Sequence, residues 1–313
     1  MLSYVVRRLA SLLVVMAIVG VSVFVITRVV PGDPAAILAG DDATAEDIAR
    51  LRTVYGLDRP LAVQFGIWLV DIGRGDLGTS IFFGQPVTAL LADRAEPTVL
   101  LSLLALLMAV AVGVPAGVIS AVRRGGFADQ AIIGAAMFNA AVPSFLSGLI
   151  LMQYLAVKLG WFPVAGYGPP DISTLGRIPY LLLPAVSLAL PNAALVARMT
   201  RGSMLDVLGE DYIRTARAKG ASARSVNMKH ALRNASVNIL TVVGLIAGAL
   251  LSGVVVVETV FGLPGVGQLV LAAVSRRDYP VIQGALIVLA AVFVLVNLVV
   301  DLLYAAIDPR IAY

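Results

Sequence analysis

Six long apolar stretches constrain the fold of this chain more than any other feature. A helix needs about 20 predominantly apolar residues to cross the hydrocarbon core of a bilayer, and each stretch reaches that length if single glycines and prolines are tolerated. The composition agrees, because 59% of the 313 residues are hydrophobic and only 13% are charged, against roughly 25% in soluble domains. We therefore expect an all-α, polytopic membrane helical bundle of about six transmembrane helices in one domain, residues 1–313. The helices are placed near residues 9–30, 97–121, 130–158, 178–199, 236–257 and 281–307.

The basic residues beside these stretches predict the orientation of the bundle. Short cytoplasmic loops are enriched in Lys and Arg, and an even number of spans then puts the N and C termini in the cytoplasm. The supporting residues are Arg7, Arg8, Arg123, Arg124, Arg310 and the loop 201–235. Arg177, Arg276 and Arg277 fall on the other side and argue against this orientation. The apolar run from Leu9 to Thr27 is longer than the h-region of a signal peptide, so we expect it to be a span.

Residues 31–96 lie between the first two spans, and the predicted orientation makes them an extracytoplasmic segment. Thr44 is expected to cap a helix that has acidic residues in its first turn and stops at Gly56. The apolar run from Leu61 to Val70 is too short to span, so we expect it to lie at the membrane interface or to cap the bundle. The segment is therefore predicted to contain helices.

The stretch from Glu210 to Asn234 is the one long, strongly basic segment of the chain. A helix is predicted from Asp206 to Ala218, followed by Gly220 in the left-handed conformation. Ser222 is predicted to cap a second helix that reaches Leu232. The segment carries the basic residues Arg214, Arg217, Lys219, Arg224, Lys229 and Arg233 and the ionisable His230. A charged helix–Gly–helix segment of this kind predicts a docking surface for a cytoplasmic partner.

Enzymatic motifs are missing from the sequence. There is no G-x-x-x-x-G-K-[ST] phosphate loop and no G-x-S-x-G elbow, so neither ATP binding of that kind nor serine hydrolase chemistry is expected of this chain. One histidine and no cysteine exclude multi-histidine and thiolate metal sites. The middles of the spans are almost uncharged, whereas ion-coupled transporters usually place ionisable groups or broken helices there. If the protein moves a substrate uphill, the energy is expected to come from another subunit.

Polar residues inside the spans are candidates for a translocation pathway or gate. Asn139, Ser144 and Asn192 either line a water-filled path or bond to a neighbouring helix and serve packing. Glu258 ends the fifth span and is either a gate or substrate contact on the outer side, or a carboxylate held at the membrane interface. The three glycines and the proline of residues 262–267 predict a sharp turn after it.

The basic segment resembles the EAA loop in the permease subunits of binding-protein-dependent ABC importers, in the dipeptide, oligopeptide and nickel branch. The family pattern is E-A-A, three residues, Gly, nine residues and I-x-L-P. Here Arg214 stands at the glutamate, Thr215 at the first alanine and Gly220 at the glycine, and His230 opens the last element. Further strings resemble the family in the same order: VVPGDP (29–34), YGLDRP (55–60), RGDLGTS (74–80), ETVF with PGVG (258–267) and DPR (308–310).

This resemblance implies that residues 201–235 form a cytoplasmic coupling loop that seats in a groove of an ATPase. For the arginines, plain topology anchoring is the alternative, but anchoring does not require Gly220. The residues assigned to ATPase coupling are Tyr212, Arg214, Thr215, Ala216, Ala218, Lys219, Gly220, Ala221, Ser222, Val226, His230, Leu232 and Arg233.

The resemblance also implies the partners and the compartment. A related second permease subunit would supply the other half of the pathway, and two cytoplasmic P-loop ATPase subunits or domains would hold ATP and Mg. A substrate-binding protein would meet the extracytoplasmic segment, and the chain would lie in the lipid of a bacterial inner membrane. No cofactor is expected in the chain itself. No nucleic acid partner is expected, because the basic residues lie at span ends and in one loop.

Import of di- and oligopeptides is the leading hypothesis for the function. Within the family, nickel or a nickel chelate is the alternative, although the lack of Cys and of a pore histidine disfavours direct metal handling. From other classes, the alternatives are a secondary transporter, a membrane enzyme and a non-transporting scaffold. The uncharged span centres argue against a secondary transporter, and the missing catalytic motifs argue against an enzyme. The kinked spans with polar residues argue against a scaffold.

Overall fold

The computed structural model describes residues 2–29, 35–36, 44–54 and 56–307. These residues form helices and a single isolated β-bridge between Thr79 and Pro86, so the described chain is all-α, as predicted. The longer helices are α1 (Leu2–Val29), α3 (Ala45–Val54), α4 (Leu61–Gly73), α5 (Val87–Val122), α6 (Phe127–Ala141), α7 (Ser144–Leu151), α8 (Ile178–Leu208), α9 (Asp211–Ala218), α11 (Leu232–Phe261), α12 (Val266–Arg276) and α13 (Tyr279–Ile307). Shorter helical segments are η1 (Met152–Lys158), η2 (Thr174–Arg177), α10 (Ala223–Ser225) and η3 (Val226–Ala231).

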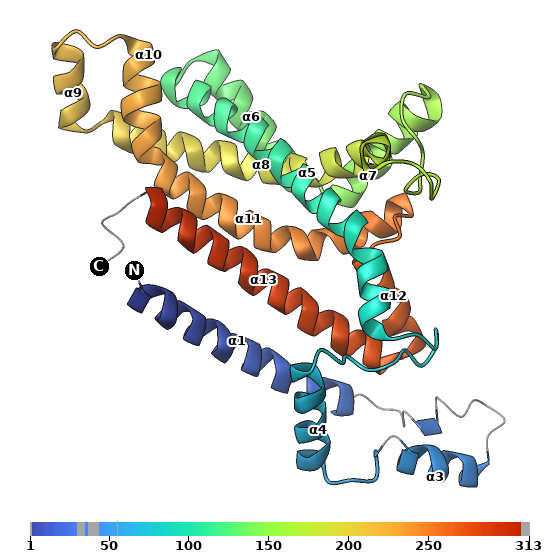
Figure 1. Cartoon of the computed structure of the whole chain (residues 1–313). Helices are drawn as coiled ribbons and strands as arrows, with labels where there is room; N and C mark the ends of the chain where they lie inside the picture. Colours follow the sequence, from blue (N-terminus) through green and yellow to red (C-terminus); the bar gives the residue numbers. More distant parts are fainter. Residues whose placement is uncertain (1, 30–34, 37–43, 55, 308–313) are drawn as a thin grey trace. The chain divides into compact units, whose positions relative to one another are not determined.

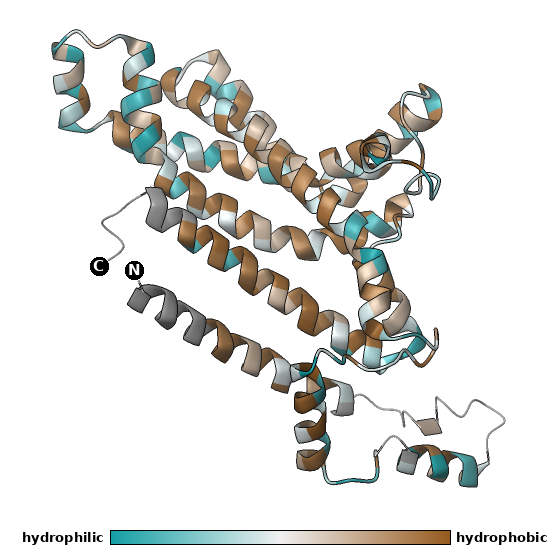
Figure 2. Ribbon diagram, in the orientation of Figure 1, coloured by the Kyte–Doolittle hydropathy of each residue, from teal (hydrophilic) through white to brown (hydrophobic). Residues whose placement is uncertain are grey.

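Four continuous helical stretches are long and apolar enough to cross a membrane. They are Val87–Val122, Thr174–Leu208, Ala223–Phe261 and Tyr279–Leu302. Each contains or largely overlaps one predicted span, and the predicted first span coincides with α1. In Figure 2, hydrophobic residues predominate along these helices, whereas α9 is largely hydrophilic. The second predicted span begins ten residues earlier than expected, at Val87 instead of residue 97, because Pro97 lies inside α5 and does not start it.

The predicted span at 130–158 is not one continuous helix, because this stretch is two helices bent by 100°. α6 ends at Ala141, and Val142 adopts an extended conformation (φ −88°, ψ 122°) directly before Pro143. A residue before proline is sterically biased away from the helical region, and proline has no N–H to continue a helix. Pro143 instead precedes α7, where its carbonyl accepts the N–H of Ser147 at 3.1 Å. The pair α6 and α7 is therefore a broken span or a re-entrant pair.

The described residues divide into two compact units. The first unit comprises Pro97–Gly267 and the chain from Leu295 onward, and the second comprises Leu2–Glu96 and Gln268–Val294. In the first unit, α8 packs against α6, α7 and α11, and α9 and α10 lie at one end of it (Figure 1). Its largest core cluster includes Leu101, Leu181, Leu188, Val196, Ile246, Leu250, Val254, Val257 and Phe261.

Two glycines bring α5 close to α8. A Cβ on Gly113 would lie 2.6 Å from the Cβ of Val196, and one on Gly117 would lie 2.5 Å from the carbonyl oxygen of Ala197. Glycines four residues apart permit this close backbone approach between helices in lipid, where packing replaces the hydrophobic effect as the driving force. The α5–α8 contact therefore depends on small residues.

In the second unit, α4 packs against α1 through aromatic side chains. The rings of Phe24 and Phe65 lie 5.2 Å apart, and those of Phe24 and Trp68 lie 5.6 Å apart. The predicted run from Leu61 to Val70 is therefore a helix, but its depth in a membrane stays a prediction. The turn before α13 is held by Asp278, which accepts hydrogen bonds from Ser80 Oγ at 2.5 Å and from the N–H of Phe82 at 3.2 Å.

The predicted cap at Thr44 is confirmed. Thr44 Oγ1 accepts the N–H of Asp47 at 3.2 Å, and the N–H of Thr44 donates to the Asp47 carboxylate at 3.1 Å. This reciprocal pair closes the N terminus of α3 as a capping box does. The hydrogen bonds from Thr44 hold the pKa of Asp47 below its usual value. The prediction that Gly56 stops this helix is consistent with its left-handed φ of 63°.

Candidate coupling elbow

The site is the helix–turn–helix of residues 209–234, which we call the elbow. The predicted continuous helix from Asp206 to Ala218 is wrong, because α8 ends at Leu208 and α9 begins at Asp211. Between them, Glu210 adopts an extended conformation (φ −70°, ψ 149°). The break lets Leu208 and Ile213 face the same apolar cluster, and burial of that cluster outweighs the continuation of one helix.

The tip of the elbow is the turn predicted from the sequence. Gly220 has a φ of 82°, and the N–H of Ala221 donates to the carbonyl of Ala216 at 3.1 Å. This is the glycine-terminated helix end in which a left-handed residue closes the last turn. Ser222 then caps the next helix, because its Oγ accepts the N–H of Ser225 at 3.3 Å. That helix does not stop at Leu232, as predicted, but continues as one helical stretch to Phe261.

The elbow has its own small core. Ile213 of α9 is fully buried and belongs to one cluster with Met204 of α8, Val226 and Ala231 of η3, and Ala235 of α11. The two arms of the elbow and the end of α8 therefore share one apolar cluster. Ile213 was not predicted from the sequence, although it is the one large aliphatic residue of α9.

The predicted coupling residues divide into an exposed group and an internal group. The exposed group is Tyr212, Arg214, Thr215, Ala218, Lys219, Gly220, Ser222 and Arg233. The internal group is Val226, which is fully buried, and the half-buried Ala216, Ala221, His230 and Leu232. The structure therefore gathers all thirteen in one elbow, with eight of them on its surface.

Two polar contacts tie the surface of the elbow together. The Oη of Tyr212 accepts a hydrogen bond from Asn234 Nδ2 at 2.7 Å, which joins α9 to the start of α11. Arg214 pairs with Asp211 at 3.1 Å, but both side chains are largely exposed, and such a pair contributes little stability. The exposed cations of the elbow are therefore available to a partner.

An ion pair between the buried Asp129 and the half-buried Arg201 fixes α8 about two helical turns before the elbow. Arg201 donates from Nε and Nη2 to the two carboxylate oxygens of Asp129 at 2.7 and 2.8 Å. Ser120 Oγ and the N–H of Gly125 also donate to this carboxylate. These bonds join the α5–α6 turn to α8, and bidentate geometry of this kind is strong. The sequence offered a weak signal only, a lone Asp at the start of a predicted span.

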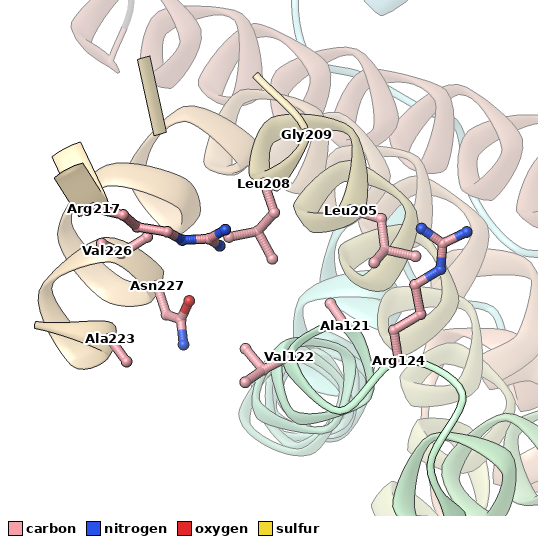
Figure 3. Close-up of a pocket in the computed structure, with 10 residues that line it drawn as sticks. All are labelled: Ala121, Val122, Arg124, Leu205, Leu208, Gly209, Arg217, Ala223, Val226 and Asn227. Atoms are coloured by element: carbon pink, nitrogen blue, oxygen red, sulfur yellow. The ribbon is translucent and has the colours of Figure 1, made fainter. Parts of the chain in front are cut away.

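A pocket of about 470 Å³ lies between the elbow and the ends of α5 and α8 (Figure 3). Arg217 lies on the elbow side with its guanidinium pointing toward Leu208, and Arg124 rises beside Leu205 on the opposite side. The remaining lining residues are Ala121, Val122, Gly209, Ala223, Val226 and Asn227. No acidic side chain is among the ten residues that line it.

The residues proposed for the translocation pathway bond within their own helices or face protein. Asn139 Nδ2 donates to the carbonyl of Ala135 at 2.9 Å, and Asn192 Nδ2 donates to that of Leu188 at 2.7 Å. Ser144 is the half-buried first residue of α7, directly after the bend. Neither amide bonds to a neighbouring helix of the described chain, so the packing alternative and a role in the pathway both stay predictions.

Glu258 is fully buried, although the sequence placed it at a span end facing outward or at the interface. Its Oε1 accepts a hydrogen bond from Thr98 Oγ1 at 2.5 Å, and Thr98 Oγ1 in turn accepts the N–H of Val266 at 2.8 Å. A Cβ on Gly265 would overlap the carboxylate, and one on Gly267 would lie 2.8 Å from Oε2. In this conformation, Glu258 therefore closes the turn between α11 and α12 and presents no surface to a substrate.

The sequence matches known transport proteins over its whole length. Residues 113–313 match the family "Binding-protein-dependent transport system inner membrane component", and residues 1–102 match its N-terminal counterpart. The chain is 48% identical over 310 residues to a probable peptide ABC transporter permease of Sinorhizobium fredii, with 99% of each chain covered. It is 43% identical to a glutathione transport system permease of Salmonella choleraesuis over the full length of both.

A solved structure shares the fold. A chain of the MetNI methionine ABC transporter, in an inward-facing conformation, superposes with a TM-score of 0.59 at 18% identity and covers 70% of this chain and 96% of its own. This likeness concerns the fold alone, whereas the full-length sequence matches define the family. The chain therefore belongs to the inner-membrane permease components of binding-protein-dependent ABC transport systems, and is a multi-pass inner-membrane protein.

Proposed function

We propose that this chain is the permease subunit of an importer of di- and oligopeptides and forms half of the translocation pathway. Peptide permeases from Sinorhizobium and Brucella, 48% and 44% identical to it, support this substrate class. A glutathione permease among the relatives also belongs to a system for a short peptide. A related second permease subunit completes the pathway, and a substrate-binding protein delivers the peptide to the side that carries residues 31–96.

The elbow is the contact with the cytoplasmic ATPases that bind ATP and Mg. The observation that carries this assignment is the exposed tip around Gly220, mounted on a core of its own that includes Ile213 and Val226. A projecting surface with a packed base can transmit a push from a partner as a movement of α8 and α11. ATP binding and hydrolysis would then shift the equilibrium between the two orientations of the permease pair.

Replacement of Gly220 tests this assignment. At a φ of 82° an L-residue is strained, although a Cβ there would meet nothing within 4 Å. Gly220→Leu is therefore expected to leave membrane insertion intact and to lower peptide uptake and substrate-stimulated ATPase activity by about tenfold, in line with a coupling loss of 1–2 kcal/mol. Gly202→Leu is the matched control, because Gly202 lies in α8 and its Cβ would also meet nothing. Wild-type uptake by Gly220→Leu would disprove the coupling role.

Two further measurements test the partners and the substrate. Purification of the tagged chain is expected to bring down a P-loop ATPase, whereas uptake without any such partner would indicate a secondary transporter. A thermal-shift screen of the cognate binding protein is expected to show stabilisation by short peptides. Stabilisation by nickel or a nickel chelate alone would replace the peptide assignment by the alternative within the family.

A further inference from the structure

The pocket beside the elbow carries positive charge without a partner. The side chains of Arg124 and Arg217 make no hydrogen bond or ion pair with another described residue. Among the carboxylates on the adjoining elements, Asp129 is bound by Arg201 and Asp211 by Arg214. Asp206 and Glu210 are exposed and do not line the pocket. Two guanidinium groups on one pocket without a lining carboxylate favour an anionic ligand, and Arg is well suited to phosphate.

The rest of the pocket wall is mostly apolar. Leu205, Leu208 and Val226 line it together with Val122 of α5. Val122 is 46% exposed, and Ile119, one turn earlier on α5, is 45% exposed. This apolar surface leads from the pocket along a helix long enough to cross the membrane. A ligand with an anionic head and an apolar tail therefore fits the lining better than a small free anion does.

The position of the pocket at the ends of two long apolar helices favours a lipid as its ligand. It lies at the C-terminal ends of α5 and α8, two membrane-spanning candidates, and lipid headgroups lie at the ends of spanning helices. Basic pockets between helices on the cytoplasmic side are known binding sites for anionic headgroups. The residues at the tip of the elbow, Ala218 to Ser222, do not line the pocket, so an ATPase seated on the tip leaves it unoccupied.

We propose that this pocket binds the phosphate headgroup of an anionic phospholipid from the cytoplasmic leaflet, with Arg124 and Arg217 as the charged contacts. The assignment to that leaflet rests on the proposed function, which places the elbow in the cytoplasm. Arg217 thereby belongs to a lipid site, and the coupling surface is confined to the tip and the outer face of α9. Bound lipid would join the elbow to the ends of α5 and α8 and would reinforce their shared core.

The test is lipid retention by the full-length chain, purified with the subunits that accompany it from membranes of equal phosphatidylglycerol and phosphatidylcholine content. Native mass spectrometry counts the lipids that remain bound. Wild type is expected to retain phosphatidylglycerol selectively, and R124Q/R217Q is expected to bind it roughly tenfold more weakly. R124K/R217K, which keeps the charges, should stay close to wild type and shows that the site tolerates substitution.

The matched control is R123Q/R224Q, which removes the same charge from two exposed arginines that do not line the pocket. It is expected to retain phosphatidylglycerol within about twofold of wild type, since surface charge contributes only a general attraction. Equal losses in the two double variants would overturn the proposal. Release of the lipid by millimolar inorganic phosphate, at constant ionic strength, would also overturn it and would identify a site for small anions.

The same preparations separate this proposal from the coupling assignment. If R124Q/R217Q loses the ATPase while its lipid content is unchanged, the pocket serves the ATPase and the lipid proposal is wrong. If Gly220→Leu retains both lipid and wild-type uptake, the coupling assignment fails and the lipid site stands. If the wild-type chain retains phosphatidylglycerol selectively but no ATPase co-purifies with it, the coupling assignment likewise fails and the lipid site stands.

Discussion

The two ends of one helical stretch, Ala223–Phe261, use the same kind of turn for opposite purposes. Gly220 precedes the stretch with a φ of 82°, and Gly262 follows it with a φ of 61°. A Cβ on Gly220 would meet nothing within 4 Å, whereas Gly265 and Gly267, just beyond Gly262, lie against the Glu258 carboxylate. The elbow therefore exposes its turn. The far end, which we call the clasp (Glu258, Thr98 and residues 262–267), exposes Gly262 but buries Leu263 and residues 265–267.

The charges differ in the same way. At the elbow, most charged side chains are exposed and one exposed pair joins Arg214 to Asp211, while at the clasp a single carboxylate is buried and hydrogen-bonded. A buried ionised or polar group is costly unless its partners are all in place, so substitutions at the clasp should affect folding. Substitutions at the elbow should affect interactions with partners. Substitutions at the two ends of this one helical stretch should therefore have different effects, on stability at the clasp and on coupling at the elbow.

The largest expected effect is that of Glu258→Ala. It removes the acceptor of Thr98 and leaves a void in a packed turn, so we expect a loss of about 2–4 kcal/mol in the free energy of unfolding. Thermal unfolding in detergent, followed by size-exclusion chromatography, measures the loss. Glu210→Ala removes the same group from an exposed site where the side chain caps nothing, and it should change stability by less than about 1 kcal/mol. Equal stabilities for the two variants would abolish the distinction between clasp and elbow.

The next effect compares glycines at the two ends. Gly267→Leu places side-chain atoms where a Cβ alone would lie 2.6 Å from Val255 Cα, and overpacking of this kind costs about 1–3 kcal/mol. Gly220→Leu should cost about 1–2 kcal/mol for the left-handed conformation, but should lower uptake far more than Gly267→Leu does at equal protein level. The measurement is peptide uptake per folded molecule for each of the two variants. A greater uptake defect in Gly267→Leu would show that the clasp also takes part in coupling.

A smaller effect is expected at the ion pair that supports the elbow. Asp129→Asn keeps the shape but removes the charge that binds Arg201, so we expect a loss of about 1–2 kcal/mol. Because this pair fixes α8 before the elbow, the ratio of substrate-stimulated to basal ATPase activity should also fall. Asp211→Asn, which breaks an exposed pair, is the control and should leave both quantities nearly unchanged. If Asp129→Asn changes neither the stability nor the ratio of substrate-stimulated to basal ATPase activity, the ion pair does not support the elbow.

The smallest expected effect is that of Tyr212→Phe. It removes the hydroxyl that accepts from Asn234, and a single exposed hydrogen bond contributes about 0.5–1 kcal/mol. Thermal stability should therefore change little, while hydrogen exchange of the α9 amides should accelerate because α9 is less firmly joined to α11. Unchanged exchange in α9 would mean that the core around Ile213 holds the elbow without this bond.

Much of the architecture follows from local patterns in the sequence. The apolar runs predicted four continuous helical stretches, and the turn residues predicted the cap at Thr44, the left-handed Gly220 and the cap at Ser222. These features depend on residues within a few positions of one another, which is why propensity and capping rules reach them. The residues assigned to coupling all lie in the elbow, but their division into exposed and internal members was not predicted, and their role stays a prediction.

Other features escaped because they depend on contacts between distant residues. The proline at 143 ends a helix while Pro97, Pro115, Pro184 and Pro191 lie inside helices, and a local rule cannot separate these cases. The break before α9 required Ile213 to be buried with Met204.

The sequence by itself determined that this protein is a helical membrane permease with a glycine-tipped elbow, because apolar length, turn chemistry and family motifs are local properties of the chain. Only the tertiary structure decided the surroundings of its charged groups. Glu258 meets Thr98 from 160 residues away and Asp129 meets Arg201 from 72 residues away, while Arg124 and Arg217 have no described partner. Whether a charged group is buried, paired or free depends on which elements pack beside it, and long-range packing alone determines that.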